Sequence, residues 1–169
     1  MRILVCNFPK RKVMKPYNKI LFCLYLVLPY FAPAQNFDPK KVVPKSLSKY
    51  DFGMSLDEFS QKNKVASIGR HDVPTRIEYK DADPDKDIKQ VTYYFGADNN
   101  QPLYEMIIAF NNVESLNEHC SKKLGAPNDR NQWKWTTRQG YTFKAWRFGT
   151  TLVLALGLPS TEWEKDWDN

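Results

Sequence analysis

The chain is poor in the residues that most often carry cross-links and metal chemistry. It has three cysteines and two histidines. Cys6 and Cys23 lie in the N-terminal region, so the remainder holds only Cys120, which excludes an internal disulfide there. His71 and His119 do not combine with this cysteine in any zinc-ligand spacing. We therefore expect no metal, no cofactor and no disulfide, and a fold that is held together by its hydrophobic core.

Motifs that identify the common classes of enzyme are also missing. The sequence has no P-loop, no G-x-S-x-G and no Rossmann glycine pattern. Cys120 falls in an apolar-periodic segment, where we expect a buried inert thiol rather than a nucleophile, which needs an activating base. His71 lies beside Asp72, as in half of a catalytic dyad, but no nucleophile accompanies the pair. We expect no catalytic residues and a protein that is not an enzyme, with an unrecognised hydrolase as an alternative.

The net charge does not point to a nucleic-acid partner. The chain carries 25 basic and 19 acidic residues, which gives a net charge of +6. Six of the basic residues precede Ile20, whereas every acidic residue follows it, so basic and acidic residues are equal in number after this point. The six are Arg2, Lys10, Arg11, Lys12, Lys15 and Lys19. A neutral body has no electrostatic reason to bind nucleic acid or anionic lipid.

A long hydrophobic run is missing as well. The apolar stretch of residues 20–32 contains Pro29 and is shorter than the ~20 apolar residues that a membrane-spanning helix needs. Basic residues precede it, and Ala32-Pro33-Ala34 follows it with the small-x-small pattern of a signal-peptidase site. We expect residues 1–34 to be a signal peptide, and the mature protein to be exported, periplasmic or secreted, with no membrane span. A retained membrane anchor is the alternative.

The rest of the chain is long enough for one domain. Residues 35–50 carry two prolines and scattered charges without periodicity, and we expect them to form an exposed N-terminal linker. The domain is predicted over residues 51–158, and residues 159–169 are predicted to form an acidic, aromatic tail.

Two similar stretches suggest an internal repeat. The sequence SLDEFSQK (Ser55–Lys62) returns as SLNEHCSK (Ser115–Lys122), and in each copy a serine is followed three residues later by a glutamate. This spacing is a capping box, so we predict that one helix begins at Ser55 and another at Ser115. Gly125 and Pro127 should end the second helix. Its inward stripe should consist of Leu116, His119, Cys120 and Leu124.

Each helix is followed by three β-branched and aromatic runs that are bounded by turn residues. The first three runs are TRIEYKD, KQVTYYFG and PLYEMIIAF, and the second three are QWKWTTR, YTFKAWRFG and TTLVLALGL. These patterns predict an α+β fold with two short helices packed on an antiparallel β-sheet. A further hypothesis is a tandem arrangement of α-β-β-β halves, residues 53–110 and 113–158. The alternative is that S-x-x-E recurs because many helices begin that way.

Short motifs carry a resemblance to a known family. Gly53-Met54-Ser55 with Glu58 opens one helix, and Leu124-Gly125-Ala126-Pro127 closes the other. Over about residues 51–158 the chain resembles the beta-lactamase-inhibitor-protein-like fold and the small outer-membrane assembly lipoproteins. The resemblance implies helices against an antiparallel sheet and an exported binding or scaffolding role. The disulfides of the inhibitors and the lipidated cysteine of the lipoproteins are missing, so inhibition of a beta-lactamase is not implied.

The acidic stretch DADPDKD is the most conspicuous polar motif. It resembles the start of a calcium loop, with carboxylates at alternate positions. A calcium loop also needs glycine at position 6 and glutamate at position 12, where this chain has Lys86 and Thr92. A solvated acidic hairpin loop is the alternative, and we expect no metal site. The carboxylates are those of Asp81, Asp83, Asp85 and Asp87.

Aromatic residues occupy both faces of the predicted second-half sheet. Trp133 and Trp135 share one face because side chains alternate along a strand, and Lys134 between them should reach water. Trp146 and Phe148 share a face with Lys144, which should be the wetter side. We therefore expect Trp133 and Trp135 to be structural. Trp146, Phe148 and Lys144 should belong to a binding surface, because Trp and Tyr are enriched at interface hot spots. The alternative is that both faces are buried.

These observations favour an exported non-enzymatic binding module of the cell envelope, protein-binding or inhibitor-like. Its partner should be another protein or an envelope component. A structural envelope component and an unrecognised hydrolase are the alternatives. The predicted core consists of Leu56, Phe59, Ile77, Tyr79, Met106, Ile108, Leu116, Leu124, Leu152 and Leu154.

Overall fold

The computed structural model describes residues 36–63, 69–73, 75–97 and 100–164, and for residues 69–73 it describes the backbone only. These residues form an α+β fold in which helices lie on an antiparallel sheet, as the sequence predicts. The segment expected to be a signal peptide, residues 1–34, lies outside the described residues. In the described part of the chain, no helix is long and apolar enough to span a membrane.

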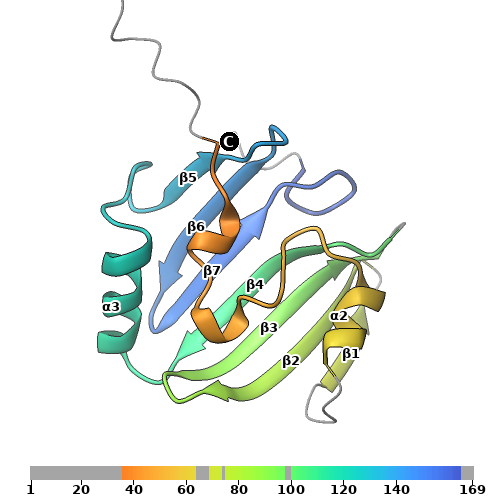
Figure 1. The fold of residues 1–169 in the computed structure, drawn as a ribbon, viewed down its shortest axis with the longest axis horizontal. Helices are drawn as coiled ribbons and strands as arrows, with labels where there is room; N and C mark the ends of the chain where they lie inside the picture. The colour runs from red at the N-terminus through yellow and green to blue at the C-terminus, as the bar shows by residue number, and fades with distance from the viewer. Residues whose placement is uncertain (1–35, 64–68, 74, 98–99, 165–169) are drawn as a thin grey trace, which may run out of the picture. The chain divides into compact units, whose positions relative to one another are not determined.

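The elements follow one another in two similar series (Figure 1). The first series is α2 (Leu56–Lys62), β1 (Gly69–Val73), β2 (Arg76–Asp85), β3 (Ile88–Gly96) and β4 (Leu103–Phe110). The second series is α3 (Val113–Lys123), β5 (Trp133–Thr136), β6 (Thr142–Phe148) and β7 (Thr151–Leu156). Two 3-10 turns, η2 (Pro39–Lys41) and η3 (Lys45–Leu47), precede them.

The seven strands form a single sheet in the order β1-β2-β3-β4-β7-β6-β5, with every neighbouring pair antiparallel. The last strands of the two series therefore pair at the centre, where Met106 lies opposite Leu154 and Ile108 opposite Leu152. Six of the strands are the predicted runs, and β1 is additional. This segment, GRHDV, is short and mostly polar, so its sequence predicts a loop instead of a strand. A duplicated origin of the two halves stays a prediction.

The helices and the N-terminal segment cover one face of the sheet, which we call the inner face (Figure 1). The core lies beneath them and includes nine of the ten predicted core residues, while Tyr79 is half-buried. Phe59 of α2 is fully buried, and its ring centroid lies 4.9 Å from those of Tyr50, Tyr93 and Phe95. This face holds most of the apolar area that stabilises the fold.

The residues predicted to be an exposed linker belong to the core, so the prediction for residues 35–50 is wrong. Val42, Val43, Leu47 and Tyr50 are each 2% exposed or less. In Figure 1 this segment lies over the sheet between α3 and α2. It forms two 3-10 turns instead of a helix or a strand. Its apolar residues therefore follow neither the 3.6-residue nor the two-residue period on which the prediction depended.

The two helices begin differently. Ser55 caps α2, because its Oγ accepts the backbone N–H of Glu58 at 3.2 Å, as predicted. The predicted second capping box is wrong, because α3 begins three residues earlier and Asn112 is its cap. The Asn112 Oδ1 accepts the N–H of Ser115 at 2.8 Å. Asparagine caps as well as serine does, and two candidate caps three residues apart compete for the same first turn.

The end of α3 is as predicted. Gly125 follows it with φ +70°, a conformation that favours glycine, and its N–H donates to the carbonyl of Cys120 at 3.0 Å. Leu116, Cys120 and Leu124 are buried beneath the helix.

Side chains and backbone from outside the sheet occupy the edge of β5. The Asn128 amide donates to the Lys134 carbonyl at 3.0 Å and accepts the Lys134 N–H at 2.7 Å. The Phe37 N–H donates to the Thr136 carbonyl at 3.1 Å. These bonds satisfy groups that an edge strand otherwise offers to another strand.

Candidate functional site on the outer face of the sheet

The outer face, which is the side opposite α2 and α3, holds the predicted binding residues. Side chains alternate along a strand, so Lys144, Trp146 and Phe148 of β6 project together from this face. Phe143 and Ala145, which alternate with them in the strand, are fully buried on the inner face. The structure thus brings the three predicted residues onto one surface.

Cross-strand pairing arranges the outer face in rows. One row is apolar, because Trp146 of β6 lies opposite Val153 of β7, which in turn lies opposite Ile107 of β4. The next row is more polar and crosses five strands. Its members are Lys144, Ala155, Glu105, Tyr94 and Glu78. Apolar contact area and charged groups therefore lie side by side on this face.

Trp163, which follows β7, connects the two rows. Its ring centroid lies 5.5 Å from that of Trp146 in an edge-to-face arrangement. Its indole N–H donates to Oε2 of Glu105 at 3.0 Å. The sequence predicts residues 159–169 as a tail, but Trp163 is only partly exposed and packs against the core. The C-terminal segment is therefore part of the outer face.

Glu162 also attaches the C-terminal segment to the sheet. Its carboxylate pairs with Nη1 of Arg76 at 3.2 Å and accepts the hydroxyl of Tyr104 at 3.3 Å. Arg76 also donates to Oε1 of Glu78 at 3.1 Å, and its guanidinium lies 4.2 Å from the ring centroid of Tyr94. A guanidinium that meets two carboxylates and an aromatic face is held in one orientation. The segment is thus fastened to β2 as well as to β4.

Glu105 is the most deeply buried carboxyl on this face, with 3% of its surface exposed. The pKa of Glu105 is raised to about 7, chiefly by burial and also by the neighbouring carboxylate of Glu162, while the indole N–H of Trp163 and the charge of Arg76 act in the opposite direction. A protonated Glu105 can donate its O–H to Glu162, whereas an ionised one faces a like charge. Because Trp163 contacts it, this carboxyl is placed to hold the C-terminal segment.

The faces of the tryptophans agree with the prediction. Trp133 is 2% exposed, and Trp135 is half-buried with its ring stacked 4.2 Å from that of Phe37. Trp146 is partly exposed, and Phe148 is 81% exposed. The binding role of Trp146, Phe148 and Lys144 stays a prediction.

Among the described side chains, the remaining candidate residues do not form a site. The side chain of His71 lies outside the described residues. His119 is held by a 2.9 Å hydrogen bond between its Nε2 and the carbonyl of Val42, and burial lowers its pKa. Cys120 is buried, and burial raises the pKa of its thiol. In the described ranges, no three His, Cys, Asp or Glu side chains are grouped as a metal site would require, and β2 continues through the acidic stretch to Asp85.

Sequence reasoning missed Glu105, Glu162 and Trp163. One signal was available for Glu105, which is the only charged residue in the apolar strand LYEMIIAF. A carboxylate is rarely buried without a partner, so its position called for one. The partners are 57 and 58 residues away in sequence, and no local pattern identifies them.

Comparison of the chain with protein-family models, with characterised proteins and with solved structures finds no match.

Proposed function

We propose that the protein is an exported, non-enzymatic binding module that contacts another protein of the cell envelope through the outer face of its sheet. The contact residues are Trp146, Phe148 and Lys144, with Trp163 beside them. The proposal depends on the exposure of Phe148, a large apolar side chain of which 81% is accessible to solvent. It lies in the same strand as Trp146 and projects from the same face.

The composition of this surface supports a protein partner. Aromatic side chains at the centre of an interface contribute most of its binding energy, and a neighbouring charged residue supplies a polar rim. After residue 20 the chain has equal numbers of basic and acidic residues, so attraction to an anionic lipid surface is weak. We therefore expect the partner to present apolar side chains toward Phe148 and Trp146.

Site-specific cross-linking tests the proposal. A photoreactive phenylalanine analogue at position 148 should form a covalent adduct with one protein in cells that export the chain. The same analogue at Val113, which is 43% exposed on α3, is the matched control and should not form this adduct. A self-adduct would support the structural envelope alternative. Equal labelling of one partner from both positions would contradict the proposed surface.

Substitution gives a second measurement with the captured partner. Phe148→Ala should weaken binding at least tenfold, as truncation of an interface hot spot does. The thermal midpoint should stay unchanged because the side chain is exposed. Val113→Ala should change neither quantity.

Export is tested separately by N-terminal sequencing. We expect the mature protein to begin at Gln35, since the small-x-small pattern ends at Ala34. Recovery of a chain with residues 20–32 intact from a membrane pellet would contradict cleavage and favour the retained anchor.

A further inference from the structure

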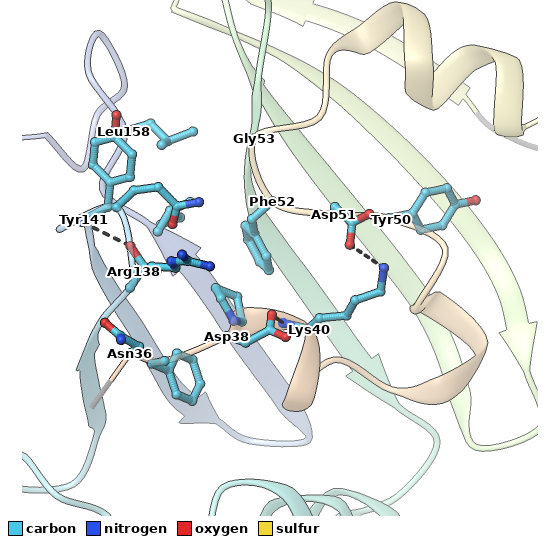
Figure 2. A pocket seen from close by; sticks show the side chains of 15 residues that line it. Asn36, Asp38, Lys40, Tyr50, Asp51, Phe52, Gly53, Arg138, Tyr141 and Leu158 are labelled. Carbon is cyan, nitrogen blue, oxygen red and sulfur yellow. Dashed lines mark hydrogen bonds and ion pairs between the residues drawn. The ribbon is translucent and has the colours of Figure 1, made fainter. Parts of the chain in front are cut away.

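A cavity of about 800 Å³ lies away from the outer-face residues. The N-terminal segment lines one side of it through Asp38, Lys40 and Phe52, and the turn between β5 and β6 lines the other through Arg138 and Tyr141 (Figure 2). Leu158, after β7, completes the apolar part. The volume is in the range of natural ligand sites, which is roughly 300–1,000 Å³.

Some of the charged side chains in this cavity already have partners, and one does not. Nζ of Lys40 pairs with Oδ1 of Asp51 at 2.7 Å, and Asp38 accepts the backbone N–H of Lys40 at 3.0 Å. Arg138 is exposed, and within the described residues its guanidinium makes no ion pair or hydrogen bond. Figure 2 shows its side chain pointing toward Phe52, across the cavity. One positive charge is therefore available to a ligand.

This arrangement selects the charge of the ligand. An arginine with five N–H donors binds a planar carboxylate through two parallel hydrogen bonds. Lys40 compensates the charge of Asp51, but the carboxylate of Asp38 in the same wall disfavours a second negative charge on the ligand, such as a phosphate dianion carries. The cavity thus fits a group with a single negative charge.

The rest of the lining selects the body of the ligand. Phe52 is half-buried, with its ring 5.1 Å from that of Phe143, and Leu158 is 8% exposed. These side chains form an apolar floor that is anchored in the core. The rim is polar, and the amides of Asn36 and Gln139 lie in it. A fatty acid needs a longer apolar channel, whereas a peptide end offers one carboxylate, one side chain and amide groups.

We propose that this cavity binds the free C-terminal carboxylate of a peptide, with Arg138 holding the carboxylate and Phe52 and Leu158 receiving an apolar last side chain. The site uses none of the outer-face residues, so it is a second binding site, and it does not depend on the function proposed above.

Paired peptides test the assignment on the purified full-length protein. The probes are N-acetyl-Ala-Ala-Phe with a free carboxylate and the same peptide with a C-terminal amide, and binding is followed through backbone amide chemical shifts. The free acid should shift the amide signals of residues 36–38, 40, 50–53 and 137–141. The amide should bind at least tenfold more weakly, since it loses a charge-assisted contact. Equal affinities for the two peptides, or no shifts with either, would overturn the proposal.

Two variants distinguish the site from general surface binding. Arg138→Gln should lower the affinity for the free acid to that for the amide. Arg130→Gln, an exposed arginine that does not line the cavity, should leave the affinity unchanged. Phe148→Ala should also have no effect, so failure here leaves the outer-face proposal untouched. An equal loss of affinity for the free acid in the Arg130 and Arg138 variants would contradict the proposed site. Glucuronate binding as tightly as the peptide acid would show that the assigned ligand is wrong.

Discussion

The two faces of one sheet differ in how they are covered. Three segments cover the inner face, namely the 3-10 turns, α2 and α3, and the rings beneath them are almost fully enclosed. In the part of the chain that the structure describes, residues after β7 attach to the outer face through Trp163 and Glu162. Burial on the inner face is apolar, whereas the outer face buries Glu105 and Glu78. The same two-residue alternation thus provides stability on one side and a chemically mixed surface on the other.

The two faces also differ in how their contributions to stability respond to a change in pH. On the inner face, burial lowers the pKa of His119, so protonation of this imidazole at low pH opposes folding. On the outer face, the attachment of the C-terminal segment includes Glu105, a carboxyl with a raised pKa, so it weakens as the pH rises and Glu105 ionises. Substitutions on the two faces should therefore differ in size and in pH dependence.

The largest effect is expected at Trp133 on the inner face. Trp133→Ala should lower the free energy of unfolding by about 3–5 kcal/mol, because a buried indole leaves a cavity and its N–H bond to the Gly125 carbonyl (3.2 Å) is lost. Trp146→Ala should cost about 1 kcal/mol, since mainly its edge-to-face contact is removed. Chemical denaturation measures both values. A larger loss at Trp146 than at Trp133 would mean that the faces are reversed.

Leu47→Ala tests whether the N-terminal segment belongs to the inner layer. Leu47 is 1% exposed, so we expect a loss of about 2–5 kcal/mol. Lys45→Ala, two residues earlier and exposed, should change the free energy of unfolding by less than about 0.5 kcal/mol. Equal small effects at both positions would show that the segment is a linker after all.

Glu105 should make stability depend on pH. Its pKa is about 7 in the folded protein against 4.5 for the free side chain, so the folded state holds this proton more tightly. The contribution is complete below pH 4.5 and is lost as the pH rises through 7, by about 3 kcal/mol. Glu105→Gln stays neutral, so the difference in unfolding free energy between wild type and variant should change across this interval. A constant difference from pH 4.5 to 8 would contradict the raised pKa.

The smallest of these effects concerns the helix caps that position the inner layer. Asn112→Ala and Ser55→Ala should each cost about 1 kcal/mol, since each removes the acceptor for a first-turn N–H. Ser115→Ala should change the free energy of unfolding by less than about 0.5 kcal/mol. Thermal melts of the three variants separate these outcomes, and a loss at Ser115 equal to that at Asn112 would restore the predicted capping box.

Much of the sheet could be predicted because the sequence patterns that indicate it involve residues close together in the chain. Alternation identified six strands, and the charges of Lys134 and Lys144 assigned the tryptophans to the correct faces. Ser55 identified the start of α2, and Gly125 the end of α3. Each of these depends on residues within a few positions of one another.

The missed features depend on contacts between distant segments. The 3-10 turns are stabilised by the sheet that they cover, so their own sequence carries no period. Asn112 and Ser115 are both acceptable caps, and the competition is decided by the whole helix. Glu105 and Trp163 meet because the chain returns after β7, and the cavity combines residues 36–53 with residues 137–158. Such sites are visible only when the topology is known.

The amide of Asn128 has a consequence for how the protein behaves at high concentration. A second molecule that tried to extend the sheet at β5 would have to displace this amide from Lys134 and the Phe37 backbone from Thr136. Each displacement exposes a hydrogen-bonding group before a new bond forms, which raises the barrier to fibril nucleation at this strand. Asn128 therefore protects the β5 edge from pairing with a second molecule, away from both proposed binding sites.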